Sequence, residues 1–232
     1  MSAPRTARER VHQEMSSEIL TVGRAQLAQN GAAALSLRSI ARQLEMAPSA
    51  LYRYYPGRDA LLSALILSAY GSLADTAERA SQVAYAAGGR DAERWAAVPR
   101  AMRQWALAHP HEWGLIFGTP VPGYRAPEDT VVPYGRVAVA LVRPVVEARA
   151  AGRLAALTPI GDATLRLAVA PVTDALFPDM PTATVVATLQ AWTTLVGAIS
   201  LELFGHWRNT VHDPERFFEQ TLGALASSVG LR

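Results

Sequence analysis

The segment from Leu35 to Leu62 constrains the fold of this chain more than any other stretch. Apolar residues in its first half recur at i, i+3, i+4 and i+7, which is the spacing of one helical face. These residues are Leu37, Ile40, Ala41 and Leu44. Ser36 stands directly before them, where its hydroxyl can accept a free backbone N–H and begin a helix. The pattern therefore predicts a short helix over residues 37–44.

A second short helix is predicted over residues 48–55. Pro48 fits its first turn, because the N–H that proline lacks would have no partner there. Leu51 and Tyr55, four residues apart, give this helix one buried edge, and Pro56-Gly57 ends it. Two short helices joined by a tight turn have the geometry of a helix-turn-helix, whose second helix enters the major groove of DNA.

The outer side of this second helix suits contact with DNA. Small side chains let a helix approach base edges, while hydroxyl and guanidinium groups reach phosphates or guanine. The contacts predicted in and beside this helix are Ala47, Pro48, Ser49, Ala50, Tyr52, Arg53 and Tyr54. Ser36, Arg38 and Arg58 are predicted to add contacts from the flanking segments. For Arg58 an alternative stays open, in which it is a surface arginine paired with Asp59.

Three runs of residues in this segment keep fixed spacings to one another. They are Leu37-Arg38-Ser39-Ile40-Ala41, Leu51-Tyr52-Arg53-Tyr54-Tyr55-Pro56 and Arg58-Asp59-Ala60-Leu61-Leu62. With the residues around them, from near Ile19 to near Leu65, they resemble the amino-terminal domain of TetR-family transcriptional regulators. The resemblance implies an all-helical homodimer whose larger carboxy-terminal domain binds a small molecule and releases DNA.

Two positions depart from the family pattern. Glu45 occupies the turn position where the family usually has glycine, which suggests a turn closed without a left-handed glycine. Ala47 stands where the family usually has serine or threonine, so one phosphate-binding hydroxyl is missing.

Composition bounds the class of protein. Half of the 232 residues are hydrophobic, yet no uninterrupted apolar run reaches the roughly 18 residues that span a bilayer. The amino terminus has no apolar core of a secretory signal. The absence of cysteine excludes disulfide frameworks and thiolate metal sites and fits a reducing cytoplasm. Residues 1–60 hold eight arginines and five acidic residues, whereas the remainder holds fourteen and fifteen, so the basic excess lies in the predicted DNA-binding part.

The chain outside this segment is predicted to be helical throughout, which makes the fold class all-α. A DNA-binding domain over residues 1–60 is followed by a larger domain over residues 61–232. Residues 1–10 are expected to be disordered until bound, with Arg5, Arg8 and Arg10 either along a phosphate backbone or in a solvated tail. Residues 118–133 form one long irregular segment, of the kind that is usually functional or disordered. The other predicted helices cover residues 11–30, 58–85, 92–108, 112–117, 134–151, 165–177, 182–203 and 218–229.

The last two predicted helices are amphipathic and have two interpretations. They either pack on their own domain or pair with their twofold mates in a four-helix bundle, as the resemblance implies. The residues expected at such a dimer interface are Val185, Leu189, Ile199, Leu203, Phe218, Leu222, Leu225 and Val229. The run from Trp192 to Gly197, followed by Leu201-Glu202, is also similar to the WHG subgroup of TetR carboxy-terminal domains, with Val196 where that subgroup has histidine.

Aromatic side chains spread over several helices favour an apolar ligand cavity in the second domain. The expected lining is Met102, Trp105, Phe117, Tyr134 and Trp192, with Thr173 or Thr193 as hydrogen-bond partners. Each aromatic residue has the alternative role of a core residue. No charged residue accompanies them to pair with a charged ligand, so the expected effector is an uncharged or weakly polar small molecule, apolar or aromatic in character.

Enzymatic and metal-binding functions find little support. The sequence has no G-x-S-x-G, P-loop, G-x-G-x-x-G or H-E-x-x-H motif, and Asp162, Asp174 and Asp179 are more typical of helix caps and solvated charges. His109 and His111, two residues apart, do not share a helical face and are expected to be loop or capping residues. We therefore expect no metal and no cofactor. The predicted function is a cytoplasmic, homodimeric transcriptional regulator, released from DNA by an effector, and a repressor by resemblance alone. The alternatives are a DNA-binding dimer without an effector and an activator.

Overall fold

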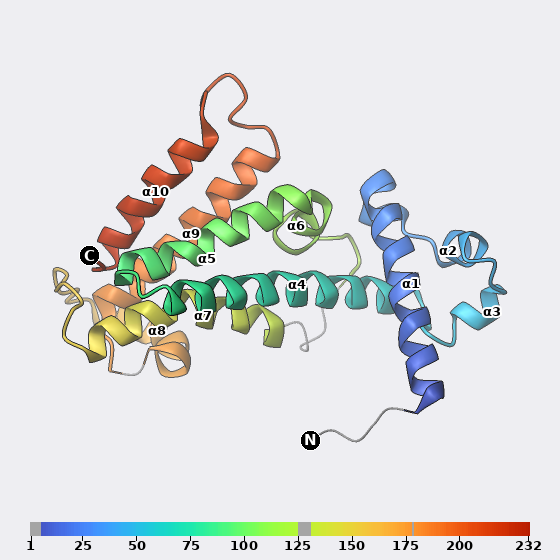
Figure 1. Ribbon diagram of the computed structural model, residues 1–232, viewed down its shortest axis with the longest axis horizontal. Helices are drawn as coiled ribbons and strands as arrows, with labels where there is room; N and C mark the ends of the chain where they lie inside the picture. Colours follow the sequence, from blue (N-terminus) through green and yellow to red (C-terminus); the bar gives the residue numbers. More distant parts are fainter. Residues whose placement is uncertain (1–5, 125–130, 178) are drawn as a thin grey trace. The chain divides into compact units, whose positions relative to one another are not determined.

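The computed structural model describes residues 6–124, 131–177 and 179–232, with the side chains of residues 131–134 outside that description. All regular structure in these ranges is helical, which confirms the all-α prediction (Figure 1). The elements are α1 (Ala7–Asn30), the 3₁₀ turn η1 (Ala32–Ala34), α2 (Leu37–Gln43), α3 (Pro48–Leu51), α4 (Arg58–Ala86), α5 (Asp91–Ala108), α6 (Pro110–Phe117), α7 (Val131–Ala150), α8 (Ala163–Leu176), α9 (Thr182–Leu203) and α10 (Pro214–Ser228).

The chain divides into two compact units. The amino-terminal unit comprises Met1–Tyr70 and His111–Val131, and the carboxy-terminal unit comprises Gly71–Pro110 and Val132–Arg232. This division differs from the expected boundary at residue 60 in two ways. The first turns of α4 belong to the amino-terminal unit, and so does a later segment that contains most of α6.

Fully buried aliphatic side chains hold the amino-terminal unit together. Its core includes Ile19 of α1, Ile40 of α2, Leu51 of α3 and Leu61 and Leu62 of α4. Leu115, Ile116, Val121 and Tyr124 from the later segment pack against this same core. The periodicity of residues 37–44 therefore predicted the inward face of α2 correctly.

Helix α1 begins earlier than the sequence predicts. Thr6 and Glu9 form a capping box, in which the Thr6 amide donates to the Glu9 carboxylate over 2.8 Å and the Glu9 amide donates to the Thr6 hydroxyl over 3.3 Å. The expectation of disorder is therefore wrong for residues 7–10, while Arg5 lies outside the described residues. The predicted end at Asn30-Gly31 is confirmed, because Gly31 has φ +73° and its N–H donates to the Leu27 carbonyl.

The turn between α2 and α3 contains a strained residue. Glu45 adopts φ +53°, the left-handed conformation that favours glycine, so this turn retains that geometry without the glycine. A side chain with a Cβ pays roughly 1–2 kcal/mol for this conformation.

Replacing Glu45 by glycine is expected to stabilise the amino-terminal unit by about 0.5–1 kcal/mol. Relief of the left-handed strain outweighs the larger entropy that glycine has in the unfolded chain. Urea unfolding of Glu45→Gly and of wild type would measure the difference. An unchanged or lower midpoint would show that the side chain of Glu45 contributes more than its backbone strain costs.

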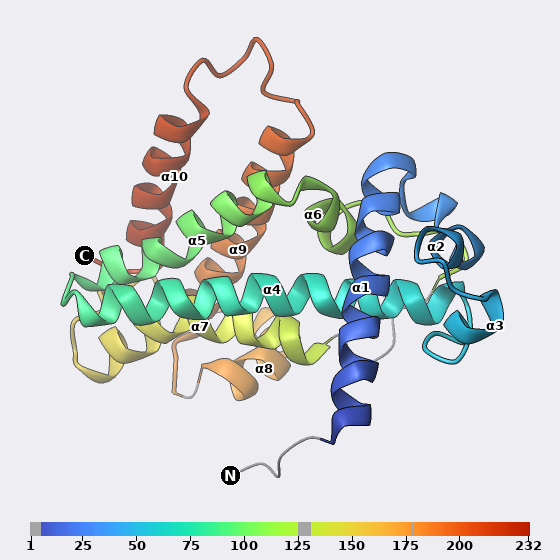
Figure 2. The same ribbon diagram turned by 45° about the vertical axis from the view of Figure 1, so that its right-hand side comes forward.

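Two bidentate ion pairs tie α5 to the last two helices in the carboxy-terminal unit. Arg103 binds Glu202 of α9 over 2.7 and 2.6 Å, with both side chains largely buried. Arg100 binds Glu219 of α10 over 2.7 Å for each bond. Helices α9 and α10 pack on α5 and on each other, as Figure 2 shows.

This packing corrects part of the expected dimer interface. Five of the eight predicted side chains lie in the core of the single chain, where no partner can reach them: Val185, Ile199, Phe218, Leu222 and Val229. Leu189, Leu203 and Leu225 are half-buried. The periodicity of α9 and α10 marked the faces that these helices bury within their own unit.

Helices α4 and α9 are long and apolar enough, by length and composition, to cross a membrane. The sequence contains no uninterrupted apolar run of this length. The two results differ because the mean hydropathy of a helix can be high even when scattered polar residues interrupt it. Core helices pass the same test, and both helices bury part of this surface inside the protein.

Candidate nucleic-acid interface

Local caps and one buried side chain position the helix-turn-helix. The Ser36 hydroxyl accepts the Ser39 amide over 3.4 Å and begins α2, and Pro48 occupies the first turn of α3. Leu51 is fully buried, so it fixes α3 on the core of the unit. Helix α3 ends at Leu51, where the sequence predicted a helix to residue 55, and residues 52–54 continue as a turn. Tyr55 therefore lies beyond α3 and not on its edge as predicted, although it packs against the core and burial raises the pKa of its phenol.

Most predicted DNA contacts lie on the surface of this unit. The exposed ones are Arg38, Ala47, Pro48, Ser49, Tyr52 and Arg53. Ser36, Ala50, Tyr54 and Arg58 are half-buried. Helix α3 thus presents small residues at its start and a tyrosine and an arginine at its end.

Two of the half-buried residues have partners within the unit. The Tyr54 ring stacks on the His12 ring of α1, with centroids 4.5 Å apart. Arg58 donates to the Ala32 carbonyl over 2.8 Å and lies 3.6 Å from Asp59. The alternative role of Arg58, as an arginine paired with Asp59, therefore matches its placement.

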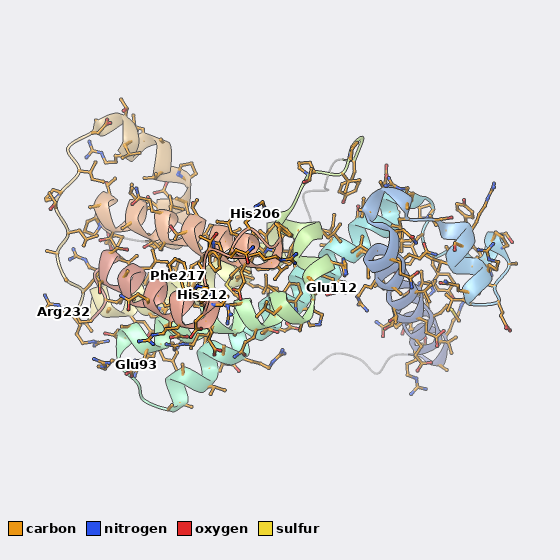
Figure 3. The ribbon with its side chains drawn as sticks, turned by 90° about the horizontal axis from the view of Figure 1, so that it is seen from above. Glu93, Glu112, His206, His212, Phe217 and Arg232 are labelled. Atoms are coloured by element: carbon orange, nitrogen blue, oxygen red, sulfur yellow. The ribbon has the colours of Figure 1, made fainter. Side chains whose placement is uncertain are left out.

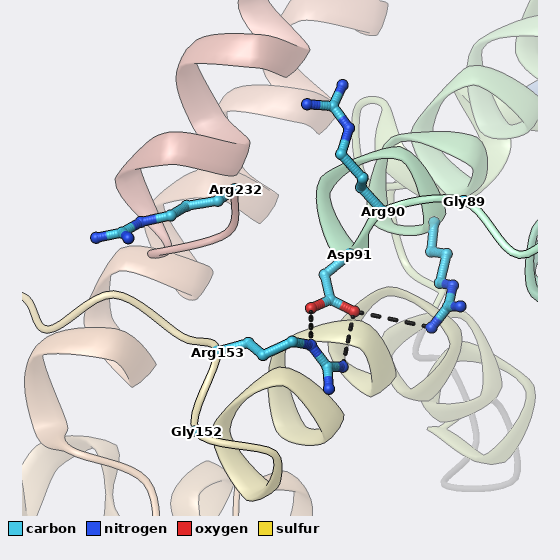
Figure 4. Close-up of a pocket in the computed structure, with 7 residues that line it drawn as sticks. Gly89, Arg90, Asp91, Gly152, Arg153 and Arg232 are labelled. Atoms are coloured by element: carbon cyan, nitrogen blue, oxygen red, sulfur yellow. Dashed lines mark hydrogen bonds and ion pairs between the residues drawn. The ribbon is translucent and has the colours of Figure 1, made fainter.

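Several arginines of the amino-terminal unit lack ion-pair partners among the residues that the structure describes. Within the described ranges, no ion pair is formed by five arginines of the amino-terminal unit: Arg8, Arg10, Arg38, Arg42 and Arg53. In the carboxy-terminal unit, many arginines are neutralised. Arg153 binds Asp91 over 2.7 and 3.0 Å (Figure 4), and this bond lowers the pKa of the Asp91 carboxyl. Arg94 lies 3.8 Å from the same carboxylate. Five arginines of the amino-terminal unit therefore carry positive charge that no ion pair within the described ranges neutralises.

The predicted effector residues do not form one group. Met102, Trp105, Thr173, Trp192 and Thr193 belong to the carboxy-terminal unit, whereas Phe117 belongs to the amino-terminal unit. Phe117 packs against Trp113 and meets the edge of Tyr70. The side chain of Tyr134 lies outside the described residues.

Within the carboxy-terminal unit, the threonines are poor donors to a ligand. The Thr173 hydroxyl donates to the Val169 carbonyl and the Thr193 hydroxyl to the Leu189 carbonyl, so each oxygen can only accept from a further partner. Thr193 is also exposed, in an open groove of about 370 Å³ lined by Leu165, Val169, Val186, Leu189, Gln190 and Thr194. This placement corrects the expectation that Thr193 faces an interior cavity. Met102 and Trp105 are buried, and the Trp105 indole donates to the Ser72 hydroxyl over 3.0 Å.

Residues that sequence reasoning missed join α6 to the amino-terminal unit. Glu112, labelled in Figure 3, is buried and binds Arg24 of α1 over 2.9 Å. Arg24 also donates to Ser68 of α4 over 3.0 Å. No spacing in the sequence signals a pair so far apart. His109 caps the end of α5 and stacks on Trp105, as expected of a capping histidine.

The fold and the exposed end of α3 define a helix-turn-helix DNA-binding protein, and comparison with known proteins agrees. Residues 19–65 match the bacterial regulatory proteins of the tetR family, and residues 95–225 match the tetracyclin repressor-like C-terminal domain. The HTH-type transcriptional regulators Rv1816 of Mycobacterium tuberculosis (strain ATCC 25618 / H37Rv) and Mb1846 of Mycobacterium bovis are each 38% identical over 230 residues, which cover 93% of this chain and 90% of theirs. This chain belongs to the TetR family of transcriptional regulators.

Solved structures agree with this assignment. The regulatory protein SCO4313 aligns with a TM-score of 0.75 at 36% identity and covers 96% of this chain and 100% of its own. RolR in complex with resorcinol aligns with a TM-score of 0.55 at 16% identity, covering 96% of this chain and 91% of its own, which shows a shared fold.

Proposed function

We propose that this chain is a cytoplasmic repressor that binds a palindromic operator as a homodimer and leaves it when a small effector binds the carboxy-terminal unit. The observation that carries the DNA-binding part is the exposed end of α3, among arginines that lack ion-pair partners. In a twofold dimer, the two α3 helices enter successive major grooves about 34–36 Å apart, or a multiple of that distance.

The proposed dimer interface is the uncharged outer stripe of α9 and α10. On α9, the exposed and half-buried residues that share this stripe are Val186, Gln190, Thr193, Thr194, Gly197, Leu201 and Phe204. On α10 the corresponding residues are Phe217, Thr221, Ala224 and Ser228. Phe217, labelled in Figure 3, is 47% exposed, and a stripe of small and apolar residues without charge suits close helix packing.

The proposed effector is an apolar or aromatic small molecule that contacts Met102, Trp105 and Trp192. These are apolar side chains of one unit, and none of them is charged. Because Thr173 can accept but not donate, an effector that carries a hydroxyl or N–H donor fits best. RolR, bound to resorcinol in its structure, supports the view that this fold accommodates a small aromatic molecule.

Replacing Arg53 by alanine is expected to weaken binding to the operator and to scrambled DNA by similar factors, about tenfold. A phosphate contact carries no sequence information, so its loss also lowers the slope of log K against log salt by about 1. Ser49→Ala is expected to change base preference instead. Fluorescence anisotropy at several salt concentrations would measure both, using the duplex that the wild type selects from a randomised library.

Arg149→Ala provides the control, because Arg149 is an exposed arginine of the carboxy-terminal unit. It should leave DNA affinity unchanged. Equal affinity of the wild type for the selected duplex and for scrambled DNA would contradict the proposed function.

A further inference from the structure

A pocket opens on the amino-terminal unit beside the residues that follow α3. It has a volume of about 570 Å³ and is lined by Ala7, Arg8, Val11, His12, Arg53 and Tyr54. The lining comes from two distant parts of the sequence, the first turns of α1 and the turn at the end of α3. None of these residues is acidic, so the pocket is open to a negatively charged group.

Two guanidinium groups and one imidazole supply its polar side chains. Arg8 and Arg53 are both exposed and form no ion pair within the described ranges. The His12 ring lies nearly parallel to the Tyr54 ring, with an interplanar angle of 17°, and His12 is exposed. The stack therefore holds α1 against the turn after α3 while leaving histidine nitrogens accessible.

A capping box satisfies two of the backbone amides at the start of α1. The Thr6 hydroxyl accepts the Glu9 amide, and the Glu9 carboxylate accepts the Thr6 amide. The positive charge available to an anion in this pocket belongs to the side chains of Arg8 and Arg53. Val11 is 60% exposed and gives one wall an apolar surface, which suits the carbon atoms of a sugar.

We propose that this pocket binds one phosphodiester group of the DNA backbone, so that α1 contacts the operator in addition to α2 and α3. Arg8 and Arg53 donate to the phosphate oxygens, an N–H of His12 adds a third donor, and Val11 packs on the adjoining deoxyribose. The inference rests on the proposed DNA-binding function. Contacts of this kind set the position and angle of a protein on the duplex without reading its sequence.

A pair of matched variants tests the site. Arg8 and Arg10 are both exposed arginines of the first turns of α1, but only Arg8 lines the pocket. Arg8→Ala is expected to weaken binding to the operator and to scrambled DNA by about tenfold each. It should also lower the slope of log K against log salt by about 1. Arg10→Ala is expected to leave the slope unchanged. His12→Phe retains an aromatic stack and removes the donor, so its affinity should also fall while its far-UV circular dichroism matches wild type.

The phosphate itself can be located with operator duplexes that carry one neutral methylphosphonate at successive positions. One position per half-site should weaken wild-type binding more than it weakens the binding of Arg8→Ala, because that variant has already lost one of the three donors to this phosphate. Equal losses of DNA affinity in Arg8→Ala and Arg10→Ala would overturn this inference alone. So would full additivity of the Arg8→Ala and methylphosphonate effects at every position of the duplex. Failure of the wild type to bind its selected duplex above scrambled DNA would overturn the proposed function and this inference with it.

Discussion

Replacing Gly197 by glutamate is expected to convert the dimer into monomers and to weaken operator binding by about 10²- to 10⁴-fold. Gly197 lies in the middle of the uncharged stripe of α9, where a twofold partner would bring a second glutamate close to the first. A Cβ at this position meets no atom within 4 Å in the single chain, so the monomer should fold normally. The loss in affinity arises because a monomer engages one half-site and forfeits the effective concentration of the second.

Analytical ultracentrifugation and anisotropy titrations would measure assembly and affinity together. Val83→Glu is the matched control, because it introduces the same charge at an apolar residue that is 70% exposed on α4. It should sediment as wild type does. A Gly197→Glu protein that still sediments as a dimer would show that another surface forms the interface.

Replacing Leu51 by alanine is expected to lower the free energy of unfolding of the amino-terminal unit by about 2–5 kcal/mol. Leu51 is fully buried, and among the described residues of α3 it alone is buried. The cavity that the substitution leaves would therefore detach α3 from the core of the unit. Operator affinity should fall with stability, since an α3 that is ordered only part of the time binds less well.

Urea unfolding followed by circular dichroism would measure the stability, and anisotropy the affinity. Ser49→Ala, in the same helix but exposed, should unfold within about 0.5 kcal/mol of wild type. Wild-type stability in Leu51→Ala would mean that α3 is held by contacts other than this side chain.

The DNA-binding part of the fold was predictable because its signals are local. Ser36 and Pro48 act within one turn of their position, and the apolar spacing of α2 needs only one amphipathic helix against one core. The left-handed conformation of Glu45 was not predictable from residue type, because the packing of α2 and α3 imposes it against the preference of a side chain with a Cβ.

Five residues expected at the dimer interface lie in the core instead, for a physical reason. Periodicity reports which side of a helix is apolar, and that side can face the protein's own core or a partner. In α9 the strongest apolar positions, such as Val185 and Ile199, are in the core. The outward stripe around Gly197 mixes apolar residues with uncharged polar ones, so its periodicity is weaker. The pocket near Arg8 was not predicted either, because α1 begins within residues 1–10, whose polar composition is typical of a disordered terminus.

The Glu112–Arg24 pair has a consequence for building hybrid regulators from this chain. An exchange of DNA-recognition modules that cuts the sequence near residue 65 would transfer Arg24 and leave Glu112 behind. The incoming module would then meet a buried carboxylate that lacks its cation, together with foreign partners for Leu115 and Ile116. The exchangeable module is therefore discontinuous, and a functional graft has to carry residues 111–124 along with residues 6–70.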